Sequence, residues 1–347
     1  LMALTKVDTS MVGYPAFGRR MNRNGDCTID QRGGLTTSQN GKGGCDGFNL
    51  ASSAFGVYSM YKDNDVAVNG FRQAHRINCT TANTSPASSA YAILQLAKFE
   101  GNNCIGLKFG TSEAEDVSVQ FWIYSNKTGT YNLELYNAKH SGSDFNVQQF
   151  TINSANTWEH KTLTFSGDTG GNQFDDSSDN QFNVNLWLAA GSSFTSGSHV
   201  ADTWANVAAN RAVNQANFAD STSNNLRITG LQVEAGNPTP FEYRSRQVEL
   251  AHCERYLEVL KSSDDGYNAI WGSSLNSDGN VWQAWHFRQE KRAKPTFFLG
   301  NSAAWSQGGT NQNVYEGVSS INFNSNSWFY FSGNPEGTAG LFADSDF

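Results

Sequence analysis

Residues 117–136, VSVQFWIYSNKTGTYNLELY, contain the pattern that decides the fold. Residues 117–124 are rich in β-branched and aromatic side chains, which favour strands, and predict a strand in the centre of a sheet. The polar residues 126–129 form a turn signal, and residues 131–136 then alternate between apolar and polar side chains with a period of two. This second segment predicts another strand, which follows the first across the turn.

The same rhythm continues on both sides of this stretch. Further strands are predicted at residues 91–99, 103–109, 145–152, 158–165, 183–189 and 226–233. About eight strands within residues 91–235, with few convincing helices, are typical of a two-sheet sandwich. We therefore expect an all-β protein whose main part is a jelly-roll β-sandwich.

The composition is polar without being highly charged. Only 16% of the 347 residues are charged, yet the mean hydropathy is −0.51, so the polarity comes from uncharged side chains and 33 glycines. These residues favour turns and exposed strand faces, while aromatic residues at 13% supply the bulk for a core. The net charge of −8 argues against a nucleic-acid partner, because neutralising phosphates requires a basic surface.

The sequence also limits membrane and disulfide hypotheses. No run approaches 18 consecutive apolar residues, and residues 1–10 lack the basic and apolar parts of a signal peptide, so we expect a soluble chain that is not inserted into a membrane. Five cysteines without a CxxC pair argue against a zinc ribbon or a dense disulfide framework. Isolated buried thiols are favoured, and one bridge among the first four cysteines is the alternative.

Three regions are expected along the chain. An extended arm at residues 1–18 precedes the jelly-roll domain at 19–245, and a second, smaller β-sandwich domain at 246–347 follows. Residues 247–261 place apolar side chains near helical spacing and predict a short connecting helix. Strand signals recur at 268–271, 281–287, 296–299, 314–323 and 328–331, and the strand-like segment 341–347 suggests that this domain is incomplete at its end.

Catalytic motifs are not found in the sequence. It contains no HExxH, GxSxG, P-loop or helix-opening GxGxxG, and the six histidines are scattered, which favours solvent-facing or capping roles. Four aspartates gather in a Gly- and Ser-rich segment, for which a solvated surface loop is favoured, a calcium site is second and general acid catalysis is last. We expect no enzyme activity and no cofactor other than calcium, whose candidate ligands are Asp175, Asp176 and Asp179.

Tryptophans are the candidate ligand-contact residues. Trp122, Trp158 and Trp187 lie inside predicted strands, where packing in the core is favoured. Exposed aromatic rings on a polar sandwich stack on sugar rings, which present an apolar face and a polar rim. Four tryptophans in loops or in the C-terminal domain are the candidates for contact with a glycan or receptor: Trp204, Trp282, Trp285 and Trp305.

Three stretches, in this order, resemble bacteriophage tail and head fibre proteins. The first consists of 19–26 (RRMNRNGD) and 28–33 (TIDQRG), followed by 45–48 (CDGF); the second consists of 230–236 (GLQVEAG) and 239–242 (TPFE); the third is 249–256 (ELAHCERY). The resemblance extends over roughly residues 19–300. Within it, Asn24-Gly25 predicts a turn with a positive φ, which glycine adopts without steric cost.

The resemblance implies a carbohydrate-binding-module-like jelly roll in a virion structural protein. Such a fibre or spike subunit is a homo-oligomer, most often a trimer, that contacts other virion proteins and a host cell-surface glycan. It is assembled in the host cytoplasm and is found in the virion. A head-decoration or tail-connector protein without receptor binding is the alternative, and a polysaccharide depolymerase or its binding module is a third hypothesis.

Overall fold

The computed structural model describes residues 19–37, 39–139, 144–260, 274–275, 281–299, 306–307, 310–311, 321–323, 328–333 and 341–346. The chain divides into two compact units, Leu1–Arg244 and Ser245–Phe347, so the division falls one residue before the predicted boundary. The predicted arm at 1–18 lies outside the described residues.

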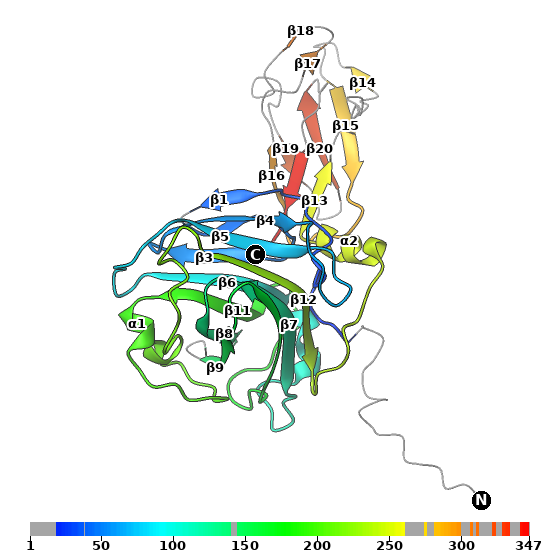
Figure 1. The fold of residues 1–347 in the computed structure, drawn as a ribbon. Helices are drawn as coiled ribbons and strands as arrows, with labels where there is room; N and C mark the ends of the chain where they lie inside the picture. Colours follow the sequence, from blue (N-terminus) through cyan, green and yellow to red (C-terminus); the bar gives the residue numbers. More distant parts are fainter. Residues whose placement is uncertain are drawn as a thin grey trace, which may run out of the picture. The chain divides into compact units, whose positions relative to one another are not determined.

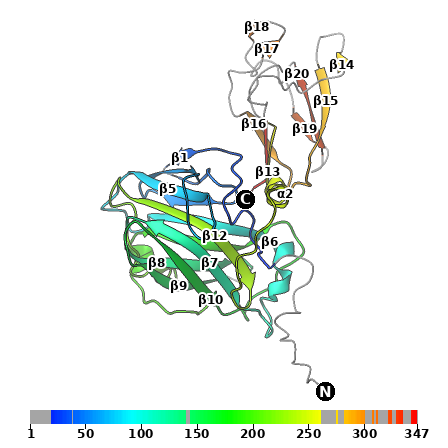
Figure 2. The ribbon, with the colours of Figure 1, turned by 45° about the vertical axis from the view of Figure 1, so that its right-hand side comes forward.

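The first unit is a sandwich of two six-stranded antiparallel sheets (Figures 1 and 2). Sheet I has the order β1 (Leu35–Thr37), β4 (Val57–Asp63), β5 (Ala74–Thr81), β12 (Asn225–Ala235), β7 (Val117–Ser125) and β10 (Thr157–Phe165). Sheet II has the order β2 (Gly41–Lys42), β3 (Asn49–Ser53), β6 (Tyr91–Glu100), β11 (Asn180–Ala190), β8 (Gly129–Asn137) and β9 (Asp144–Ile152). The chain crosses repeatedly between the sheets, and the all-β sandwich expected from the sequence is confirmed.

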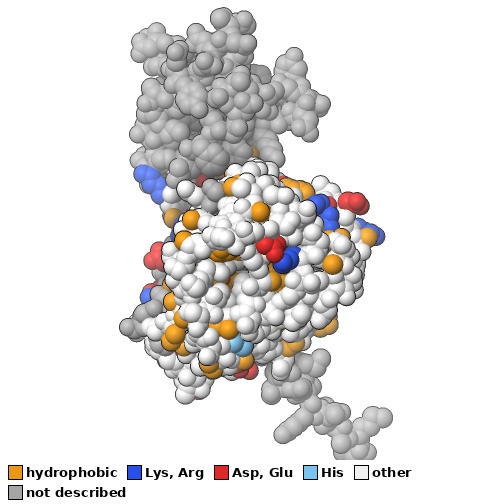
Figure 3. Space-filling view, turned by 60° about the vertical axis from the view of Figure 1, so that its left-hand side comes forward, with side chains coloured by type: hydrophobic (Ala, Val, Ile, Leu, Met, Phe, Trp, Pro, Cys, Tyr) orange, Lys and Arg blue, Asp and Glu red, His pale blue; other side chains and the backbone are white. Residues whose placement is uncertain are grey.

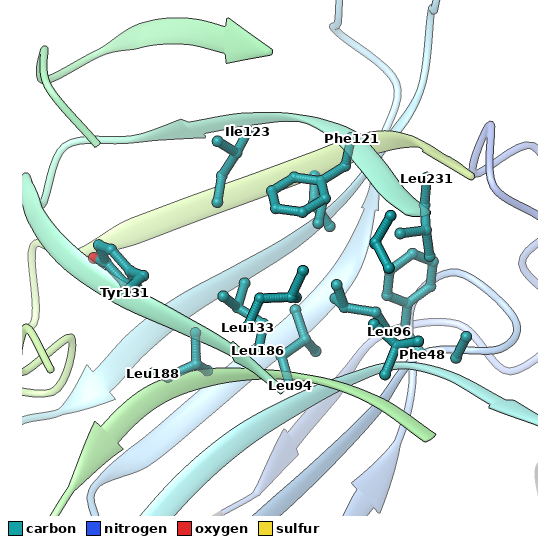
Figure 4. Packing of buried hydrophobic residues seen from close by; sticks show 14 of the residues in the cluster. Phe48, Leu94, Leu96, Phe121, Ile123, Tyr131, Leu133, Leu186, Leu188 and Leu231 are labelled. Carbon is teal, nitrogen blue, oxygen red and sulfur yellow. The ribbon is translucent and has the colours of Figure 1, made fainter. Parts of the chain in front are cut away.

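The core lies between the two sheets. In β7, Phe121 and Ile123 point into it, and Leu133 of β8 and Leu186 of β11 meet them from the other sheet (Figure 4). All four side chains are fully buried. The period-two alternation in the sequence therefore separates the side chains that face the core from those on the outward face of each sheet.

Most of the predicted strands are confirmed, with two differences. Residues 103–109 are not a strand: the 3₁₀ turns Gly101–Asn103 and Ile105–Leu107 occupy this region, and Lys108 ends them in the left-handed conformation at φ 54°. No prediction covered β3, β4 and β5. Serines at outward positions of β3 and β4 weaken the strand signal there.

The residues of the first fibre-like stretch form a buried polar cluster. Asn24 donates to the carbonyl oxygens of Ile29 at 2.8 Å and Asp46 at 2.9 Å, and its own side-chain oxygen accepts from the Ile29 amide at 2.9 Å. The Asp46 carboxylate accepts from the backbone of Gln31 at 2.9 Å and from its side chain at 2.7 Å. The positive φ predicted for this turn belongs to Asn24, at 50°, and Gly25 has a different role.

The second unit begins with helix α2 (Arg246–Glu254), whose N-cap Ser245 accepts from the Val248 amide. The helix is shorter than predicted, because residues 257–260 form strand β13 (Leu257–Leu260) instead. Two of the sheets in this unit are β13, β21 (Leu341–Asp344) and β16 (Thr296–Leu299), and β14 (Ser274–Leu275), β15 (Val281–His286), β20 (Trp328–Gly333) and β19 (Ile321–Phe323). Strands β17 (Ser306–Gln307) and β18 (Thr310–Asn311) pair separately, and the strand predicted at 268–271 lies outside the described residues.

The surface of the first unit reflects the composition. Figure 3 shows a face on which uncharged polar side chains and backbone predominate, with lysine, arginine and acidic side chains scattered among them. All five cysteines are buried free thiols, in agreement with the favoured reading. In the part of the chain that is described, no helix is long and apolar enough to cross a membrane.

His75 is buried in the core, so the expectation of a solvent-facing or capping histidine is wrong at this position. Its ring stacks on Phe48 with centroids 4.5 Å apart, and within the described residues neither ring nitrogen has a hydrogen-bond partner. Burial lowers the pKa of His75 from 6.5 to about 3. The neutral imidazole therefore packs as a flat, nearly apolar ring.

This burial predicts a pH-dependent loss of stability. Above pH 6.5 His75 is neutral in both states, whereas below it the unfolded chain binds a proton that the folded side chain refuses until about pH 3. The free energy of unfolding should therefore fall as the pH falls through this window, by about 2 kcal/mol at pH 5. Urea unfolding at pH 8 and pH 5 measures the loss, and a His75→Phe variant should lose about 2 kcal/mol less than the wild type. Equal losses in both proteins would contradict this account.

Candidate functional site

A cavity of about 270 Å³ lies on the outward face of sheet II, opposite the core. In β11, Val184 and Leu186 point into the core, while Asn183, Asn185 and Trp187 alternate with them and face the cavity. Segment 191–212, which includes α1 (Ser192–Thr195) and the 3₁₀ turn Ala208–Asn210, contributes further side chains. The complete lining is Ala51, Tyr91, Ile93, Gln95, Tyr136, Asn183, Asn185, Trp187, Phe194 and Arg211.

A buried ion pair organises one side of this cavity. The carboxylate of Glu134 in β8 is fully buried and accepts two hydrogen bonds from Arg211, from Nε at 2.8 Å and Nη2 at 2.7 Å. It also accepts from the Asn185 side chain at 3.0 Å and from the indole nitrogen of Trp187 at 3.1 Å. Four donors thus hold one carboxylate and fix the orientation of three cavity-lining side chains.

Burial alone would lower the pKa of Arg211, but the facing Glu134 carboxylate outweighs burial and raises it above its ordinary value. Arg211 is therefore charged, and its charge is balanced by Glu134. The other nine lining residues carry no formal charge near neutral pH. The cavity is consequently polar but close to electrically neutral.

Aromatic rings form the wall next to the ion pair. Trp187 is fully buried and lies 5.2 Å from Phe194 and 5.1 Å below the Arg211 guanidinium, measured from ring centroids. Tyr91 meets the edge of Phe194 at 5.8 Å. Phe194 and Tyr91 are partly exposed and present apolar ring surface beside hydrogen-bonding groups, whereas the Trp187 ring is covered. Ring surface beside hydrogen-bonding groups is the combination that a sugar ring requires.

Two amide oxygens at the cavity have no hydrogen-bond partner within the described residues. They are the Oδ1 atoms of Asn183 and Asn185, whose residues are only 5% and 4% exposed. Leaving a buried acceptor unpaired costs about 1–3 kcal/mol, so two such groups in one small cavity need an explanation. Hydroxyl groups of a ligand are donors of the kind that would satisfy them, once the lining side chains move apart to admit the ligand.

The cavity lining contains no carboxyl group, and the nearby Glu134 carboxylate is engaged by four donors. Retaining and inverting glycosidases require two acidic groups flanking the sugar bond. The chemistry that these lining residues support is therefore binding by stacking and hydrogen bonding.

None of the four tryptophans predicted as glycan contacts is found in the lining of this cavity. One of them packs elsewhere, and the side chains of the other three lie outside the described residues. Trp204 packs edge to face on Phe109 at 5.4 Å, and its indole nitrogen donates to the Ser166 carbonyl at 2.8 Å. Trp282 and Trp285 belong to β15, but their side chains lie outside the described residues, as does Trp305. The role of these four as glycan contacts stays a prediction.

Of the three predicted calcium ligands, Asp175 has a carboxylate that is held by other side chains, and the calcium site stays a prediction. The Asp175 carboxylate accepts from the Lys139 amine at 2.6 Å and from the Gln181 side chain, and these contacts lower its pKa. Asp179 donates its backbone amide to the Ser177 hydroxyl, and Asp176 is exposed. Among the described residues, no group of three or more His, Cys, Asp or Glu side chains is placed to hold a metal ion.

The cavity residues were not singled out from the sequence. Trp187 is buried as predicted, but on the outward side of sheet II, and Trp122 and Trp158 are half-buried on the outward face of sheet I instead of in the core. The available signal was the alternation at 183–187, where two asparagines and a tryptophan share one face of a strand whose other face is apolar. Asn132, Glu134 and Tyr136 repeat this pattern in β8.

No protein-family model matches the sequence, and no curated protein matches it. Similar solved structures include the enzymatically active domain of bacteriophage CBA120 tailspike protein 4, at 11% identity and a TM-score of 0.34, covering 62% of this chain and 21% of that chain. A family 30 carbohydrate-binding module is similar at 11% identity and a TM-score of 0.31, covering 64% and 92% of the two chains. The family 11 module of Lic26A-Cel5E from Clostridium thermocellum is similar at 9% identity and a TM-score of 0.29, covering 66% and 99%. Similarities at this level are too low to assign a function.

Proposed function

We propose that this protein binds carbohydrate in the cavity on the outward face of sheet II. The observation that carries the proposal is the pair of buried, unpartnered amide oxygens of Asn183 and Asn185 beside the aromatic wall of Trp187 and Phe194. The oxygens would accept hydrogen bonds from sugar hydroxyls, while the partly exposed rings of Phe194 and Tyr91 would contact the apolar face of the sugar. Because the cavity is nearly neutral, we expect an uncharged sugar unit as the ligand.

We further propose that the chain is a fibre or spike subunit of a bacteriophage virion and that glycan binding serves attachment to the host surface. Support comes from the three fibre-like stretches in the sequence, the first of which builds the buried cluster around Asn24 and Asp46. A homo-oligomer, most often a trimer in such proteins, would multiply a weak single-site affinity through avidity.

An architectural role without receptor binding remains the alternative, because the same sandwich serves both purposes. A depolymerase activity is the third hypothesis, and the engaged Glu134 carboxylate argues against catalysis at this cavity. The location of the protein in imaged particles separates attachment from architecture: an exposed, distal position favours attachment.

Removing an unpartnered oxygen should weaken ligand binding without weakening the fold. Asn183→Ala deletes a hydrogen-bond acceptor for the glycan, and we expect at least tenfold lower affinity, about 1.4 kcal/mol. Because the wild-type oxygen has no partner within the described residues, the free energy of unfolding should stay within about 1 kcal/mol of the wild type or rise. Glycan-array binding followed by calorimetry with the best oligosaccharide measures the affinity.

Asn102→Ala is the matched control, because Asn102 lies exposed in a 3₁₀ turn away from the cavity. It should bind the oligosaccharide like the wild type. Wild-type affinity in both Asn183→Ala and Asn185→Ala would overturn the assignment of this cavity as the glycan site.

A further inference from the structure

The outward face of sheet I carries five side chains in direct cross-strand register. Trp158 of β10 pairs with Tyr124 of β7, which pairs with Arg227 of β12, then Arg76 of β5 and Tyr61 of β4. These five strands are neighbours in sheet I. At about 4.8 Å between strands, this cross-strand row is about 19 Å long, which is the length of a short oligosaccharide.

The side chains of the cross-strand row pack against one another. Trp158 and Tyr124 have ring centroids 5.5 Å apart, and the Arg227 guanidinium lies 4.7 Å above the Tyr124 ring. At the other end, the Arg76 guanidinium lies 5.4 Å above the Tyr61 ring. The row therefore presents aromatic surface at both ends and two guanidinium groups in the middle.

The two arginines exceed the negative charge beside them. A single carboxylate oxygen of Asp63 accepts from Nε of Arg227 at 2.7 Å and from Nη1 of Arg76 at 3.3 Å. Arg76 also donates from Nε to Asn78. Within the described residues, the two terminal nitrogens of Arg227 and Nη2 of Arg76 have no hydrogen-bond partner, and the side chains are 20% and 25% exposed. The row thus keeps one net positive charge and several unused donors in a protein of net charge −8.

The neighbouring part of the same face is covered by the chain itself. The Gln120 side chain donates to the Thr239 carbonyl, and Glu234 accepts from the Thr239 amide at 2.7 Å and hydroxyl at 2.6 Å. The hydrogen bonds of the cross-strand row involve only Asp63, Asn78 and Asn156 among the described residues. The five side chains of the row are all partly exposed, whereas the other half of the face is occupied by the segment around residue 239.

We propose that the cross-strand row is a second glycan-binding surface, which takes an extended acidic polysaccharide with its carboxylates on Arg227 and Arg76. The free guanidinium donors match sugar carboxylates in charge and in planar geometry, and the flanking rings offer stacking surface. A second copy of this chain fits less well, because a two-fold contact through this face would bring the same arginines close together. The row lies on the sheet opposite the neutral cavity, so the two surfaces select different sugars.

The test titrates the full chain with hexagalacturonate and with the same hexasaccharide after reduction of its carboxyl groups. We expect the wild type to bind the acidic form, with an affinity that falls as salt is added, and to bind the reduced form at least tenfold more weakly. Arg227→Gln and Arg76→Gln should each lose at least tenfold in affinity for the acidic form. Lys108→Gln, which breaks an ion pair elsewhere on the surface, should bind the acidic form like the wild type.

A purely structural role predicts different results. Cross-strand pairs stabilise a sheet by about 0.2–1 kcal/mol each, so Arg227→Gln would then lower the melting temperature without changing affinity. That result would overturn the proposal. Equal binding of the acidic and the reduced oligosaccharide would also overturn it, as would a wild-type protein that does not bind at millimolar concentration. A concentration-dependent dimer that Arg227→Gln abolishes in sedimentation would overturn it in favour of a contact between copies.

Discussion

Arg211→Met should be the most destabilising of the substitutions at the cavity, lowering the free energy of unfolding by about 3–5 kcal/mol. Arg211 supplies two of the four hydrogen bonds to the fully buried Glu134 carboxylate, and it is the cation that balances it. Without it a charge would remain buried and uncompensated, because Asn185 and Trp187 are neutral donors. Urea unfolding followed by intrinsic fluorescence and circular dichroism gives the free energy.

Two further variants make this prediction specific. The double variant Glu134→Leu/Arg211→Met removes both charges together and should recover much of the lost stability. Lys108→Met breaks the exposed pair with Glu115, which should cost less than about 1 kcal/mol. A loss below 1 kcal/mol for Arg211→Met, or a double variant less stable than the single one, would contradict the role given to this ion pair.

Gly25→Ala should destabilise the first unit by about 3 kcal/mol or more. A Cβ atom at this position would lie 2.0 Å from the carbonyl oxygen of Leu231 and 2.9 Å from the side-chain nitrogen of Asn22. This carbonyl belongs to the backbone of β12. The Leu231 amide donates to the Gly25 carbonyl oxygen at 2.9 Å, so the two backbone segments cannot move apart without breaking this hydrogen bond. Thermal and urea unfolding measure the effect.

Gly106→Ala is the control for Gly25→Ala. Gly106 lies in the 3₁₀ turn Ile105–Leu107, and no heavy atom of its surroundings lies within 4 Å of the position that an added methyl group would take. We expect a change within about 0.5 kcal/mol, as for other surface substitutions. Equal effects of the two substitutions would show that close packing at Gly25 is not what constrains this position.

The fold was predictable from the sequence because apolar and polar side chains alternate with a period of two in many strands that have one face toward the core. Residues 117–124 and 183–189 lie in β7 and β11 as expected. The helix predicted at 247–261 was too long, since Leu257 and Val259 pair with β21, a strand more than 80 residues further along the chain. Pairing at such a distance overrides local helical preference, and a single sequence does not reveal it.

The candidate site was much less predictable. Tryptophans in a loop or in the C-terminal domain were the expected glycan contacts, whereas the cavity is lined by Trp187, which is fully buried within a strand. The ion pair beside the cavity joins Glu134 to Arg211, which comes from a loop 77 residues further along the chain. Nothing in the local sequence of either residue indicates this pairing. The turn at Asn24-Gly25 was recognised, but the reason for its glycine is the distant carbonyl of Leu231. Contacts of this kind depend on tertiary structure.

The central claim is that the cavity on sheet II binds a glycan through Asn183, Asn185 and Trp187. The most direct measurement is a titration of the ¹⁵N-labelled protein with the best oligosaccharide from a glycan array, observed through side-chain amide and indole N–H resonances. We predict that the Asn183 and Asn185 amide signals and the Trp187 indole signal shift together with one saturation curve. Saturable binding that leaves these three signals unmoved, or no oligosaccharide that binds at millimolar concentration, would contradict the account.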